Sequence, residues 1–264
     1  MALDYLGLLA DLRHESERLL EHLKPLTTQQ WELPSPAAGW SIKDQVTHLA
    51  FFDDAAILAL RYPLDFRVEA DALIAGGMDF PDRIAEQHRG FAPHTVVNWF
   101  IDSRYELLDT LAGDEAKRRV PWFGPDMSVA SSATARLMET WAHGQDVYDA
   151  IGVPHPASPG LRSIAHLGVA TFAFTHTLNG FDVPEEPVRV ELRSPAGDRW
   201  VWGPPDAAQR VSGPAEDFVL TVTQRRHWTQ TRLIAEGATA AAWLDIAQAF
   251  AGAATRRRPQ VVPS

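Results

Sequence analysis

Three side chains in two segments of this chain have the types and the spacing of a metal site. Glu139 and His143 stand in the run Arg-Leu-Met-Glu-Thr-Trp-Ala-His-Gly-Gln-Asp, and His48 stands in Gly-Trp-Ser-Ile-Lys-Asp-Gln-Val-Thr-His-Leu-Ala. A spacing of four on a helix stacks two side chains on one face, so that one cation can contact both. A third ligand from another helix leaves a fourth coordination position open, which is typical of a catalytic zinc site. We therefore predict that these three residues bind a divalent metal.

Two neutral imidazoles and a carboxylate suit zinc, and they also suit nickel, manganese or iron. The open coordination position can hold water, a thiol or a substrate carbonyl. A bound thiol would lose its proton because the cation stabilises the thiolate, and a bound carbonyl would be polarised. Asp146 follows His143 by three residues, so it can lie beside that ligand and accept a proton. A surface carboxylate is an equally good interpretation of Asp146.

The polar residues around the Glu/His pair also have simpler interpretations. At 100° per residue, one helical stripe collects Ser132, Arg136, Glu139, His143 and Asp146. A solvent-exposed polar face would explain that stripe equally well. A lone histidine in an apolar helix, such as His48, is more often a satisfied core residue than a ligand. The joint pattern favours the metal site, because facing helices of a bundle can bring such ligands to one cation.

The amino-acid composition limits which classes of partner and which kinds of metal and thiol chemistry are possible. The net charge of −10 argues against a nucleic-acid or anionic-membrane partner, because phosphate groups require a basic surface. The chain contains no cysteine, so nitrogen and oxygen atoms must hold any metal, and thiol chemistry would need an external thiol. Neither a secretory signal nor a run long enough to span a bilayer is recognisable. We predict a soluble cytoplasmic protein.

Long helices are needed to position these residues. Apolar side chains recur at three- and four-residue steps in four segments, which predicts an up-down bundle. The predicted helices cover about 2–24, 42–60, 94–112 and 129–151. The second of them is apolar on both sides, so His48 should lie inside. The connection 61–93 should contain helical pieces near 66–75 and 81–89.

The second half of the chain has a different pattern. A further apolar helix is expected at about 160–179, and alternating residues after Pro187 predict a strand hairpin. Helices near 214–226 and 238–252 should flank a strand near 230–235. The predicted fold class is therefore α+β. We predict three parts: a metal-binding four-helix bundle over 1–155, a connecting helix and linker over 156–184, and a small α+β domain with a flexible tail over 185–264.

The two motifs around the predicted ligands resemble the metal-binding motifs of the DinB-like superfamily. The closer similarity is to its mycothiol-dependent maleylpyruvate isomerase branch, of the actinobacterial type. The resemblance implies a four-helix bundle whose metal is bound by a helix-two histidine, here His48, and by a helix-four pair, here Glu139 and His143. The branch also carries an aspartate three residues after the last ligand, which Asp146 matches. Mycothiol or a similar thiol is the cosubstrate that this resemblance implies.

The second half adds to the resemblance. The run Val-Ser-Gly-Pro-Ala-Glu-Asp-Phe, followed by Thr-Gln-Arg, resembles the C-terminal domain of that branch, an α+β module related to sterol carrier proteins. An arginine follows this helix in the family, and Arg225 matches it. The resemblance implies that Arg225 holds an anionic part of the thiol or the substrate. Arg104 and Arg226 are further arginines that could meet an anionic ligand.

Three features depart from the family pattern. The connection 61–93 is long, Gln224 replaces the usual glycine before the arginine, and the loop Trp122-Phe123-Gly124-Pro125 is distinctive. These departures bear on the substrate more than on the metal.

The leading hypothesis is a metal-dependent enzyme that uses a low-molecular-weight thiol for transfer or isomerisation. Its partners would be the thiol and a small anionic or electrophilic substrate, with a homodimer as one option. Asp146 would assist proton movement. A metal-dependent hydrolase that uses bound water is the nearest enzymatic alternative. A non-catalytic ligand-binding protein with a structural metal is an alternative of a different class.

Overall fold

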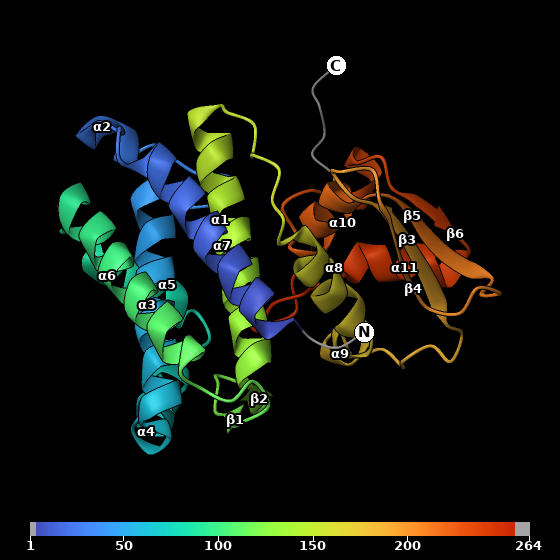
Figure 1. Cartoon of the computed structure of the whole chain (residues 1–264), viewed down its shortest axis with the longest axis horizontal. Helices are drawn as coiled ribbons and strands as arrows, with labels where there is room; N and C mark the ends of the chain where they lie inside the picture. The colour runs from blue at the N-terminus through green and yellow to red at the C-terminus, as the bar shows by residue number, and fades with distance from the viewer. Residues whose placement is uncertain (1–3, 257–264) are drawn as a thin grey trace. The chain divides into compact units, whose positions relative to one another are not determined.

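The protein divides into two compact units, Met1–Ser158 and Pro159–Ser264 (Figure 1). The structure is a computed structural model that describes residues 4–256. The first unit is mainly helical and the second combines helices with a sheet, so the predicted α+β fold class is confirmed. The start of the first predicted helix and the end of the predicted tail lie outside the described residues, and the predicted three-part subdivision stays a prediction. None of the described helices is both long and apolar enough to cross a membrane.

Four long helices make up most of the first unit. They are α1 (Tyr5–Leu23), α3 (Ile42–Arg61), α6 (Pro93–Ala112) and α7 (Val129–Ile151). Each packs against two of the others, in the order α1, α7, α3, α6 and back to α1. Ser41 and Asp44 form a capping box at the start of α3, and Ser128 caps α7. Gly152 ends α7 with a left-handed φ of +71°, which glycine adopts without steric cost.

The long connection after α3 folds into two helices that pack on α3. They are α4 (Pro63–Ala75) and α5 (Phe80–His88), each with a proline in its first turn. Phe80 packs with Phe52 of α3, and Phe66 packs with Ala59 of α3. A short helix, α2 (Thr28–Trp31), precedes α3. Two short antiparallel strands enclose the loop before α7, and the sequence did not predict them. They are β1 (Arg119–Val120) and β2 (Met127–Ser128).

One buried guanidinium joins all four long helices. Arg104 of α6 donates to the carboxylate of Asp53 in α3, from Nε to Oδ2 at 2.7 Å and from Nη2 to Oδ1 at 2.9 Å. Its Nη1 donates to Ser16 Oγ of α1 at 2.5 Å and to Thr140 Oγ1 of α7 at 2.8 Å. The side chains of Arg104 and Asp53 are 1% and 0% exposed. Because buried charges are costly unless paired and hydrogen-bonded, this cluster requires all four helices in one register.

The second unit contains a four-stranded sheet in the order β4-β3-β5-β6, in which β3 and β5 run parallel. The strands are β3 (Val188–Arg193), β4 (Arg199–Trp202), β5 (Gln209–Pro214) and β6 (Ile234–Glu236). The helices are α8 (Leu161–Ala170), α9 (Phe172–Leu178), α10 (Ala215–Val222) and α11 (Ala238–Ile246), with the 3-10 helix η1 (Trp228–Gln230). Phe218 of α10 and Trp243 of α11 pack edge-to-face, with ring centroids 5.8 Å apart in the core.

One prediction for this unit was wrong in detail, and one strand was not predicted. The helix expected at 160–179 is broken at Thr171, whose hydroxyl donates to the Gly168 carbonyl oxygen at 3.0 Å. A local hydrogen bond of this kind competes with continuation of the helix. Strand β5 was not predicted, because only Val211 among its residues is fully buried and the sequence shows no clear alternation.

Gln224 follows α10 and stops it earlier than predicted. Its φ of +58° lies in the left-handed region, where a side chain costs about 1 kcal/mol. Its amide nitrogen donates to the carbonyl oxygens of Ala247 at 3.1 Å and Thr255 at 2.8 Å. Its amide oxygen accepts from the Thr255 hydroxyl at 2.8 Å. A glycine would adopt this φ freely, which is a physical reason for the glycine usual in the resembled family.

Replacing Asp53 by asparagine should lower the free energy of unfolding by about 3–5 kcal/mol, because it leaves the Arg104 charge buried without a counter-charge. Glu106→Gln is the matched control. It removes the exposed partner of Arg61 and should change stability by at most about 1 kcal/mol. Urea unfolding followed by helical circular dichroism measures both values. A similar small loss in the two variants would contradict the structural role of the cluster.

Candidate metal centre

The structure brings the three predicted ligands together. His48 lies on α3, and Glu139 and His143 lie one turn apart on the neighbouring helix α7. One potential ligand atom from each residue lies within 4.8 Å of the other two. Glu139 Oε2 is 3.1 Å from His143 Nε2 and 3.6 Å from His48 Nε2. Two imidazole nitrogens and a carboxylate oxygen therefore converge on one point, and this donor set fits a divalent cation such as zinc.

The three candidate ligand side chains are largely shielded from solvent. The exposed fractions are 12% for His48, 17% for Glu139 and 11% for His143. Ser132, Arg136 and Asp146, the other polar residues of this stripe on α7, are also buried. The alternative prediction of a solvated polar face is therefore wrong. Shielding of this kind limits competing water at the candidate ligands.

Gln45 orients His143 and was missed by sequence reasoning. Its side-chain oxygen accepts a hydrogen bond from His143 Nδ1, so Nε2 is left to face Glu139. The amide nitrogen of Gln45 donates to Ser35 Oγ at 2.7 Å, and this hydroxyl donates to the Trp40 carbonyl oxygen at 2.9 Å. A contact that fixes the tautomer and the ring orientation is typical of metal-binding histidines. Its position in the sequence could have identified it, because Gln45 precedes His48 by three residues and therefore lies on the same face of the helix.

Aromatic packing holds the imidazole of His48. Its ring centroid lies 4.4 Å from that of Phe52, 5.4 Å from that of Trp40 and 4.2 Å from that of His143. His48 Nδ1 is buried and has no hydrogen-bond partner among the described residues. Ring contacts rather than a polar contact therefore orient this ligand, with Nε2 toward Glu139.

Local electrostatics favour an ionised Glu139. Burial alone raises the pKa of this carboxyl, but hydrogen bonds from His143 and His48 and the charge of Arg136 hold it well below its usual range. Burial lowers the pKa of Arg136, and the charges of Glu139 and Asp53 oppose that shift. The guanidinium carbon of Arg136 lies 5.1 Å from the ring centroid of Trp122. The buried guanidinium of Arg136 therefore lies one helical turn before Glu139, the carboxylate that would bind the metal.

The other predicted residues lie in different settings. Asp146 is buried on α7, one turn beyond His143. Arg225 belongs to the second unit, just after α10, and its Nη1 donates to the Thr223 carbonyl oxygen at 2.8 Å. Roles for Asp146 and Arg225 in chemistry remain predictions. Arg104 is engaged in the core of the first unit by Asp53, Ser16 and Thr140, so the structure gives it a structural role.

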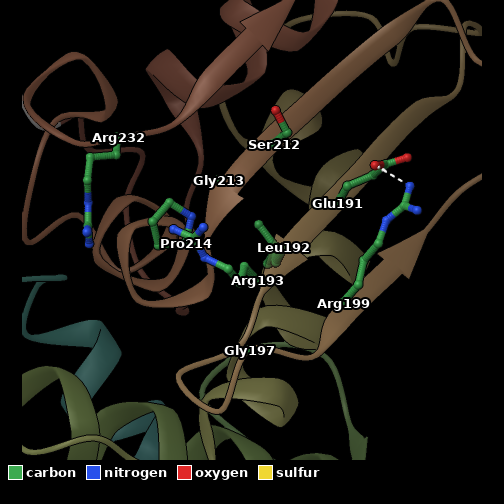
Figure 2. A pocket seen from close by; sticks show the side chains of 9 residues that line it. All are labelled: Glu191, Leu192, Arg193, Gly197, Arg199, Ser212, Gly213, Pro214 and Arg232. Atoms are coloured by element: carbon green, nitrogen blue, oxygen red, sulfur yellow. Dashed lines mark hydrogen bonds and ion pairs between the residues drawn. The ribbon is translucent and has the colours of Figure 1, made fainter.

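The second unit has a cleft of its own, of about 420 Å³, beside β3, β4 and β5 (Figure 2). Arg199 pairs with Glu191 at 2.5 Å across neighbouring strands, and Arg232 pairs with Asp217 at 3.0 Å. Figure 2 shows Arg232 on the opposite side of Gly213 and Pro214 from Glu191. Arg225 is not among the residues that line this cleft. Two of its three lining arginines, Arg199 and Arg232, are paired with these carboxylates.

Comparison with known proteins places the first unit in a family. Residues 12–148 match the family model described as the mycothiol maleylpyruvate isomerase N-terminal domain. The chain belongs to this family. The match includes all three predicted ligands, and it confirms the family resemblance seen in the two motifs. Residues 184–236 match a second family model, described as wyosine base formation.

Relatives of this family member cover nearly the whole chain. Uncharacterized proteins from two strains of Mycobacterium tuberculosis are 46% identical over 249 residues, which is 94% of this chain and 97% of theirs. Crystal structures of the mycothiol-dependent maleylpyruvate isomerase, and of a histidine-to-alanine mutant of it, align with a TM-score of 0.60 and 16% identity. They cover 84% of this chain and 90% of their own. At this identity the likeness establishes a shared fold.

Substituting any one of His48, Glu139 or His143 by alanine should reduce bound metal to a small fraction of the wild-type amount. Two ligands hold an open-site cation much more weakly than three. His94→Ala, at an exposed position at the start of α6, is the control and should retain the full amount. Elemental analysis of protein purified without chelators or metal columns gives the stoichiometry. Full metal content in all three ligand variants would place the site elsewhere.

Gln45→Leu should weaken metal binding by roughly 10–100-fold, because it removes the acceptor that orients His143. Gln45→Glu keeps an acceptor oxygen and should recover much of the affinity. Competition with a chromophoric chelator measures both dissociation constants. If the leucine variant binds metal as tightly as the wild type, then Gln45 serves packing alone.

Proposed function

We propose that this protein is a divalent-metal-dependent enzyme that uses a low-molecular-weight thiol, mycothiol or a similar compound, in a transfer or isomerisation reaction. The observation that carries the proposal is the convergence of His48, Glu139 and His143 in a member of this family. Zinc is the proposed metal, although nickel, manganese or iron also suit two imidazoles and a carboxylate. We propose a cytoplasmic location, where such thiols are abundant in reduced form.

The metal would stabilise the thiolate form of a bound thiol at neutral pH. Ionised Glu139 would supply the anionic ligand, and Gln45 would keep His143 Nε2 directed toward Glu139. Asp146, buried one turn beyond His143, would accept or return a proton of the substrate. Arg225 would hold an anionic part of the thiol or substrate, as the family resemblance implies. The substrate would be a small anionic or electrophilic molecule.

Calorimetry of the metal-loaded protein with mycothiol tests the proposal. A free thiol is mostly protonated at pH 7, so binding as thiolate should release about one proton per thiol. The observed heat should therefore vary with the ionisation enthalpy of the buffer. Glutathione and cysteine serve as alternative thiols, and His143→Ala protein should give no such signal. If no thiol gives a heat of binding, the thiol-dependent hypothesis is contradicted. The hypotheses of a water-dependent hydrolase and of a ligand-binding protein would then be favoured.

Asp146→Asn separates chemistry from metal binding in the same protein. It should retain metal and thiol binding while lowering turnover by about 10²–10⁴-fold, since it removes a proton acceptor without removing a ligand. The assay is mycothiol-dependent isomerisation of maleylpyruvate, the reaction named for the structural neighbours. Asp149→Asn, further along the same helix, is the matched control. Equal rates for the two variants would remove Asp146 from the mechanism.

A further inference from the structure

A second cavity lies in the first unit, beside the metal centre. It has a volume of about 380 Å³, and residues of α3, α4, α5 and α6 and of the loop between β1 and β2 line it. This volume lies within the range of about 300–1,000 Å³ that is usual for small-molecule sites. Most of the lining residues belong to α3 and α4, and α5, α6 and the loop contribute one each, namely His88, Trp99 and Phe123. None of the three metal ligands lines it.

Aromatic side chains from four elements surround this cavity. Phe51 of α3, Phe66 of α4, Trp99 of α6 and Phe123 of the loop line it. The rings of Phe66 and Phe123 meet edge-to-face with centroids 5.2 Å apart. The faces of aromatic rings carry negative electrostatic potential and attract cations, most strongly where water is excluded.

Carboxylates outnumber basic groups in the lining of the cavity. Asp54 and Glu69 contribute carboxylates, and no lysine or arginine lines it. His88 also lines it, and its Nδ1 donates to the Ile84 carbonyl oxygen at 2.7 Å. The indole N–H of Trp99 donates to Asp54 Oδ2 at 2.6 Å and holds this carboxylate at the wall. Burial raises the pKa of Asp54, the Trp99 hydrogen bond lowers it, and the charges of Asp53 and Glu106 raise it. A cation in the cavity would relieve this crowding of negative charge.

Aromatic walls with two carboxylates, one histidine and no lysine or arginine match one class of ligand. We propose that this cavity binds a small organic cation with an apolar body, such as an alkyl- or arylammonium compound. The rings would cover the apolar body and the ammonium group, and Asp54 and Glu69 would neutralise its charge. The site is distinct from the metal centre, so the proposal does not rest on the thiol-dependent function.

Ring contacts link the cavity to the candidate metal centre. The ring centroid of Phe52 lies 4.4 Å from that of His48 and 5.5 Å from that of Phe123. Phe123 lines the cavity directly. An occupant of the cavity would therefore sit two rings away from a metal ligand.

Titration calorimetry of the full-length, metal-loaded protein tests the proposal with three probes of similar shape. Benzyltrimethylammonium is the cation, benzyl alcohol is the neutral probe and benzoate is the anion. The cation should bind at least about tenfold more tightly than benzyl alcohol, and benzoate should bind more weakly still. Equal affinities for the three probes, or no binding of the cation, would overturn the proposal.

Variants locate the bound cation. Asp54→Asn and Glu69→Gln should each weaken its binding by about two- to fivefold, as expected for partly exposed charge pairs. Asp71→Asn is the matched control, because this exposed carboxylate lies on α4 near Glu69 but does not line the cavity. His143→Ala should bind the cation normally while losing the metal. Wild-type affinity in both cavity variants, or loss of cation binding in His143→Ala, would overturn the assignment.

Discussion

The contacts of a single guanidinium set the register of the whole first unit. Arg104 reaches one partner on each of the other three long helices, and its four hydrogen bonds leave little tolerance for sliding or rotation. Asp53 follows Phe52, which packs on His48, and Thr140 follows Glu139. The residues that align the helices thus lie next to residues that form or contact the candidate metal centre.

Several charged side chains surround the candidate metal centre. Two guanidinium groups, those of Arg104 and Arg136, and three carboxylates, those of Asp53, Glu139 and Asp146, lie on α3, α6 and α7. A divalent cation would add positive charge to this poorly solvated region. An anion in an open coordination position, such as a thiolate or a hydroxide, would offset part of that charge.

The predictable part of the molecule is the part that local rules determine. Helix periodicity and a spacing of four identified Glu139 and His143, and a capping serine marked the start of the helix that carries His48. Asp53 and Arg104 are 51 positions apart in the sequence, and no local sequence pattern predicts that they pair. Gln45 was overlooked because a glutamine on a buried helix face has no characteristic spacing. Strand β5 was missed because its contribution to the sheet depends on β3 and β6 rather than on its own alternation.

Gln224 has a consequence for how the C-terminal segment is anchored within the second unit. The resembled family usually has glycine at this position, which enters the left-handed region freely but offers no side chain. In this chain the same backbone turn carries an amide that binds Ala247 and Thr255, so the polypeptide after α11 is tied back to the end of α10. With glutamine in place of glycine, the same backbone turn therefore also holds the C-terminal segment through side-chain hydrogen bonds. Relatives with glycine here need another way to retain this segment, so residue 224 and residues 247–255 should vary together across the family.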